Sequence, residues 1–87
     1  MAPNDVRGVL KREPFEPFRM CLSDGLSYEV RHPELVWVGL SSLMLGFPAQ
    51  PDSPFYERAI KIALRHIVRL EPLEGHAKGS ANGPPPG

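Results

Sequence analysis

The sequence is short of the features that identify many functional classes of protein. Its single cysteine, Cys21, cannot form an internal disulfide or supply the paired thiolates of a zinc ribbon. Ten Lys and Arg residues balance ten Asp and Glu residues, so the chain lacks the basic excess typical of proteins that bind nucleic acid or anionic membranes. It has no apolar run of the roughly 18 to 20 residues that a membrane helix needs, and no basic-then-apolar signal sequence. These absences predict a small cytoplasmic protein with a single domain.

Motifs for catalysis are missing as well. The chain has no glycine-rich phosphate loop, no nucleophile elbow and no carboxylates paired at catalytic spacing. His32, His66, His76 and Cys21 are not spaced as a set of metal ligands. We therefore expect no catalytic residue, no metal, no cofactor and no small-molecule substrate. His32, in a predicted bend, is expected to bond a backbone carbonyl, and His66 is expected to have a similar structural role.

Composition divides the chain into three parts. Residues 74–87 read EGHAKGSANGPPPG, with two alanines as their only apolar residues. Such a segment buries too little surface to offset its ordering entropy, so it is predicted to be a disordered Gly/Pro-rich tail. Residues 15–73 have the composition of a folded domain. Residues 1–14 are expected to form an N-terminal helix and the start of a connector.

The N-terminal segment has the spacing of a short helix over residues 4–13. Asn4 or Asp5 is a suitable cap for its first turn. Pro14 ends it, because the residue before a proline is disfavoured in helical backbone. Three apolar side chains share one face of this helix: Val6, Val9 and Leu10.

Residues 18–30 have the alternation of a β-hairpin. Two strands, residues 18–22 and 26–30, flank an Asp24-Gly25 turn, in which glycine adopts a positive φ without a Cβ clash. The alternation predicts these inward side chains: Phe18, Met20, Leu22, Leu26, Tyr28 and Val30. Cys21 faces the other way, where it is either partly exposed or covered by the N-terminal helix.

The rest of the chain is expected to hold more short strands. After a bend at 31–34, residues 35–39 and 42–46 predict two strands that end on glycine, and prolines predict a loop over 47–55. Residues 56–70 fit either of two structures. As a helix they form one apolar stripe opposite charged residues, whereas their β-branched residues favour two strands.

A resemblance favours the strands. The runs FEPFRMCLSDGLSYEVRHPELVWVG and LRHIVRLEPLEG resemble a family of short uncharacterised bacterial proteins, and the order of elements is distantly similar to the Sm-like variant of the SH3-like β-barrel. This resemblance implies a mainly β fold: a small barrel of about five short strands with an N-terminal helix, and residues 56–70 as strand, 3₁₀ turn and strand. The alternative is an α+β fold with a helix over 56–70.

The sequence departs from the Sm-like pattern at two places. Val30 stands where Sm-like proteins usually have glycine. Arg65-His66 lies one residue closer to the following isoleucine than the Lys-His pair of the Sm-like RNA chaperone.

Two functions follow, neither enzymatic. The first is an interaction or assembly module that forms homo-oligomers through strand edges, because a core of this size without disulfide or metal is helped by self-association. The alternative is an Sm-like RNA-binding homo-oligomer. Trp37 is expected to be buried or at an interface, or else to stack on a base. The locally basic last third supplies the candidate nucleic-acid residues: Arg58, Lys61, Arg65, His66 and Arg69.

Overall fold

Within residues 1–73 the fold is mainly β, with one N-terminal helix and two three-stranded antiparallel sheets. A computed structural model describes residues 1–73. The predicted tail, residues 74–87, lies outside the described residues, and with it His76. The elements in chain order are α1 (Pro3–Leu10), β1 (Phe18–Leu22), β2 (Ser27–Val30), η1 (Pro33–Leu35), β3 (Val36–Val38), β4 (Ser42–Pro48), β5 (Tyr56–Ala63), η2 (Leu64–His66) and β6 (Ile67–Pro72).

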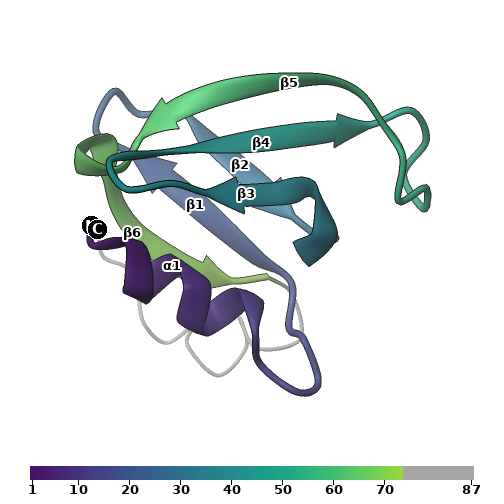
Figure 1. The fold of residues 1–87 in the computed structure, drawn as a ribbon, viewed down its shortest axis with the longest axis horizontal. Helices are drawn as coiled ribbons and strands as arrows, with labels where there is room; N and C mark the ends of the chain where they lie inside the picture. Colours follow the sequence, from purple (N-terminus) through teal and green to yellow (C-terminus); the bar gives the residue numbers. More distant parts are fainter. Residues whose placement is uncertain (74–87) are drawn as a thin grey trace.

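The two sheets do not close into a barrel, so the expectation of a closed barrel is wrong. One sheet has the order β2-β1-β6 and the other β3-β4-β5. Pro33 has no backbone N–H and begins the 3₁₀ turn η1, which separates β2 from β3. β2 then pairs with β1, and β3 pairs with β4. Residues 1–73 therefore form six strands instead of five, and Figure 1 shows how these strands are arranged.

The segment 56–70 forms a strand, a 3₁₀ turn and a strand, as the resemblance implies. β5 pairs with β4 along its whole length, whereas β6 pairs with β1 in the other sheet. η2 makes the turn between the two sheets, and the Leu64 N–H donates to the Ser41 carbonyl at 2.9 Å. The helical alternative is wrong. The first half of the segment pairs with β4 in one sheet and the second half pairs with β1 in the other, and a single helix could not form strand pairs with either sheet.

The predicted hairpin is confirmed, with one error at its turn. Gly25 has a φ of 93°, and the Leu26 N–H donates to Asp24 Oδ1 at 2.9 Å. Leu26 was expected to be inward but is 56% exposed. The reason is that β2 begins at Ser27, so Leu26 belongs to the turn and the inward–outward alternation does not extend to it.

The N-terminal helix is shorter than the sequence predicts. Its N-cap is Ala2, and not Asn4 or Asp5; Pro3 opens the helix, and the Asp5 carboxylate accepts a bond from the Ala2 N–H. It ends at Leu10 because residues 11–13 are all charged and exposed, so another turn would bury nothing. Val6 is fully buried, and the helix lies below β3 in Figure 1.

The core lies between the two sheets and is closed on one side by α1. Its buried members are Val6, Phe18, Met20, Val30, Val36, Leu43, Leu45, Ile62, Leu64 and Ile67. β4 runs to Pro48, two residues beyond its prediction, and Leu35 lies in η1 instead of the predicted strand. In Figure 1, β3, β4 and β5 run side by side across the upper half of the molecule.

Candidate interaction surfaces

The five predicted nucleic-acid residues do not form one cluster. Arg58 lies over the Phe47 ring, with its guanidinium carbon 4.3 Å from the ring centre. Lys61 is on β5, and Arg65 and His66 are neighbours in η2. His66 Nδ1 is in hydrogen-bond contact with the Ser23 hydroxyl at 3.3 Å. Arg69, on β6 in the other sheet, bonds Glu71. Three of the five, Arg58, His66 and Arg69, thus have structural partners, and the set spans both sheets.

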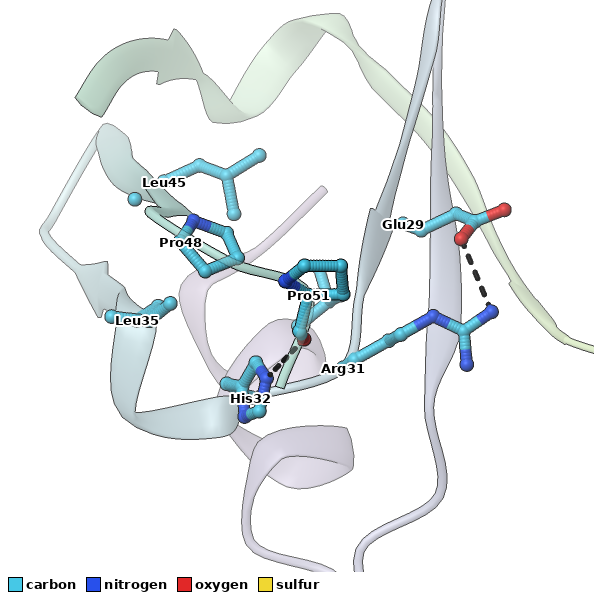
Figure 2. Close-up of a pocket in the computed structure, with 9 residues that line it drawn as sticks. Glu29, Arg31, His32, Leu35, Leu45, Pro48 and Pro51 are labelled. Atoms are coloured by element: carbon cyan, nitrogen blue, oxygen red, sulfur yellow. Dashed lines mark hydrogen bonds and ion pairs between the residues drawn. The ribbon is translucent and has the colours of Figure 1, made fainter. Parts of the chain in front are cut away.

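A small pocket lies where β2 runs into η1. It has a volume of about 220 Å³ and an apolar wall that includes Leu35, Leu45 and Pro48 (Figure 2). The expectation for His32 is confirmed, because its Nε2 donates to the Pro51 carbonyl at 3.1 Å and so ties the 49–55 loop over the pocket. At the rim, Arg31 bonds Glu29 at 3.2 Å. A pocket below roughly 300 Å³ is small for a ligand, and these polar groups already bond one another.

The outer face of the β3-β4-β5 sheet carries an exposed apolar row. Leu43 and Leu45 point into the core, so the alternation of β4 sends Met44 to the outside. Trp37 of β3 and Lys61 of β5 are the register partners of Met44, and the three side chains cross the sheet in one line. Trp37 is 45% exposed, so it is not buried within the chain.

Tyr56 lies beside Trp37 in this row, above the backbone of Gly46. The Trp37 and Tyr56 rings meet edge to face with centroids 5.6 Å apart. A Cβ on Gly46 would lie 3.0 Å from Tyr56 Cβ and 3.4 Å from the Trp37 ring, so the absence of a side chain lets both rings rest on the sheet. Tyr56 remains 54% exposed. We call Trp37, Met44, Gly46, Tyr56 and Lys61 the Trp37 face.

Cations border the Trp37 face. Between α1 and β3 runs an open groove of about 560 Å³, lined by Trp37, Arg7 and Lys11, with Glu34 as its acidic member. Arg7, Lys11 and Lys61 form no ion pair with any other residue in 1–73. The sequence did not identify this surface, because Trp37, Tyr56 and Arg7 are brought together only by the register of the sheet and the docking of α1.

A second groove lies where the sheets fail to close. β5 pairs with β4 on one side only, and within the described residues its other edge has no strand beside it. The β1–β2 turn lies opposite that edge, and the groove between them has a volume of about 420 Å³. Leu26, exposed at this turn, lines the groove together with Tyr28 and Ile60. The arrangement presents unpaired backbone groups beside apolar side chains.

Cys21 is buried within an ionic cluster on the β2-β1-β6 sheet. Burial first, and then the negative charge of Glu71, raise the pKa of the Cys21 thiol above its usual value. The hydrogen bond from Arg69 holds the pKa of Glu71 below its usual value. Arg19 links the cluster by reaching Glu29 at 3.5 Å and Glu71 at 3.6 Å. A buried thiol with a raised pKa is a poor nucleophile.

Comparisons with protein families, curated proteins and solved structures found nothing that matches the chain.

Among residues 1–73, no three or more His, Cys, Asp or Glu side chains are grouped to hold a metal ion. Within the same residues, no helix has the length and apolar character to cross a membrane.

Proposed function

We propose that the protein is a non-enzymatic assembly module whose copies associate through the free edge of β5. The observation that carries this proposal is the edge itself. β5 is eight residues long and contains no proline, and among residues 1–73 it pairs with a neighbouring strand on one side only. An exposed strand edge is a template for pairing with another chain, and monomeric proteins usually cover or interrupt it.

The side chains around the edge support the same proposal. Leu26 and Tyr28 stand across the groove from Ile60, so a strand added to β5 would bury apolar surface as well as pair its backbone. Leu26 is 56% exposed, so covering it with a second copy would remove apolar surface from water. The described fold also has neither a disulfide nor a metal site to stabilise its small core.

The order of elements suits an assembly of this kind. The N-terminal helix, the hairpin with an Asp-Gly turn, and the strand–3₁₀–strand ending are those that the Sm-like resemblance implies. We propose that the two sheets are an opened relative of that barrel, in which association of copies supplies the closure that Pro33 and η1 prevent within one chain.

The test is the mass of the protein in solution, measured by size-exclusion chromatography with light scattering. At tens of micromolar protein, we expect a mass that is a multiple of 9.7 kDa. Leu26→Asp should weaken association about tenfold or more, because it places a charge in a contact that becomes apolar.

Val68→Asp is the matched control. Val68 is 51% exposed, comparable to Leu26, but lies on β6 in the other sheet. It changes the net charge by the same amount and should leave the mass unaltered. A monomer of 9.7 kDa at these concentrations, or an equal effect of both substitutions, would contradict the proposal.

A further inference from the structure

We infer that the Trp37 face is a docking surface for an acidic polypeptide segment of a partner protein. The inference concerns a different surface from the β5 edge, because the face lies on the outer side of the β3-β4-β5 sheet and the edge lies at its margin. Lys61 adjoins both, since it also lines the groove beside that edge. The ligand class is a short acidic stretch of chain that also carries apolar side chains.

The charges around the face indicate the sign of the partner. Most arginines of this protein are neutralised by carboxylates: Arg12, Arg19, Arg31 and Arg69 each pair with a glutamate. Five cationic side chains form no ion pair among residues 1–73: Arg7, Lys11, Arg58, Lys61 and Arg65. Three of these five, Arg7, Lys11 and Lys61, border Trp37 or share its row. Unpaired cations around an apolar patch favour a partner of opposite charge and repel a basic one.

The apolar part of the face shows that the partner is more than a simple anion. Trp, Tyr, Met and Arg are the residue types enriched at protein interfaces, and Trp and Tyr carry most of the binding energy there. Trp37 and Tyr56 are each about half exposed and hold one another in a fixed edge-to-face geometry. Such rigid rings bind with little loss of conformational entropy, and the groove beside α1 offers room for apolar side chains.

A polypeptide suits this face better than a nucleic acid. The chain has zero formal net charge, so it lacks the long-range field that draws a polyanion to a protein. The groove also contains Glu34, which would repel a continuous row of phosphates. A peptide can place its carboxylates opposite the three cations and keep them away from Glu34.

The experiment uses the emission of Trp37, which is the only tryptophan in the chain. Two synthetic peptides of equal length are titrated into the full-length protein: one in which Glu and Asp alternate with Phe and Leu, and one in which each acidic residue is Lys. A single-stranded oligouridylate is titrated in a third series. We expect saturable binding of the acidic peptide in the micromolar range and at least about tenfold weaker binding of the lysine peptide.

Charge reversal on the face then identifies the site. Lys11→Glu with Lys61→Glu should reduce affinity for the acidic peptide about tenfold or more and increase affinity for the lysine peptide. Arg65→Glu with Arg58→Glu changes the net charge equally but lies off the face, and should leave both affinities within about twofold. Circular dichroism checks that each variant is folded.

Three results would overturn the inference. The first is no saturable binding of the acidic peptide up to about 1 mM, where an interaction is too weak to be specific. The second is equal loss in the face variant and in the control variant. The third is tighter binding of the oligouridylate than of the acidic peptide, which would assign the face to RNA.

Discussion

At the scale of single residues, the neighbours of a charged side chain decide its role more than its type does. Arg19 and Arg69 are held by Glu29 and Glu71 on one sheet, whereas Arg58 lies over an aromatic ring. The sequence shows Arg58 and Arg69 as members of one basic region in the last third of the chain. The cross-strand register that pairs them with carboxylates is set by tertiary structure, so the free cations could not be distinguished from the neutralised ones beforehand.

Cys21 gives a residue-scale prediction about pH. Thiols react as thiolates, and burial and Glu71 raise the pKa of this thiol, so less thiolate is present at any given pH. The rate of alkylation by iodoacetamide should therefore rise at higher pH than for a free cysteine. Glu71→Gln removes the negative charge while Arg69 and Arg19 remain, so the pKa should fall and alkylation at about pH 8 should become faster.

Mass spectrometry of the alkylated protein over time gives the rate. Glu34→Gln is the control, because it removes a carboxylate that is not among the groups shifting Cys21. The rate in Glu71→Gln should stay below that of a free thiol, since burial remains. An unchanged profile in Glu71→Gln would show that the Glu71 charge does not act on the thiol.

At the scale of elements, local signals predicted what local interactions form. The Asp24-Gly25 turn and the alternation around it were sufficient to predict the β1–β2 hairpin. The segment 56–70 was different, because its apolar spacing fits a helix as well as two strands. Its structure is decided by β4 and β1, the strands that it pairs with, and these lie far away in the sequence.

The helix α1 gives an element-scale prediction about stability. Val6 is 0% exposed and sits in the core beside the two sheets, so Val6→Ala leaves a cavity and removes buried apolar surface. We expect the free energy of unfolding to fall by about 1–2 kcal/mol. Urea denaturation at fixed protein concentration measures it, since association would also stabilise the fold.

Val68→Ala is the comparison for this prediction. Val68 is 51% exposed on β6, so its truncation should change the free energy of unfolding by no more than about 0.5 kcal/mol. Equal effects of the two substitutions would mean that α1 does not close the core in solution.

At the scale of the whole molecule, the open side between the sheets is the feature that the sequence described least well. A barrel was expected, and Pro33 was expected to make a bend. In the structure, η1 begins at Pro33 and lies between β2 of one sheet and β3 of the other, and within residues 1–73 β5 has a strand beside it on one side only. The Trp37 face was not predicted from the sequence. The signal available for it was the alternation of β3, in which Trp37 lies between Val36 and Val38 and therefore points away from the core.

The most direct test of the assembly proposal is amide hydrogen exchange of β5 at low and high protein concentration. Alternate amides of β5 bond β4 and the others face the free edge, where they exchange readily in a single copy. We predict that exchange over residues 56–63 slows as concentration rises, while β1, paired on both sides within one chain, stays unchanged. Exchange of β5 that is independent of concentration would contradict the proposal that copies associate through this edge.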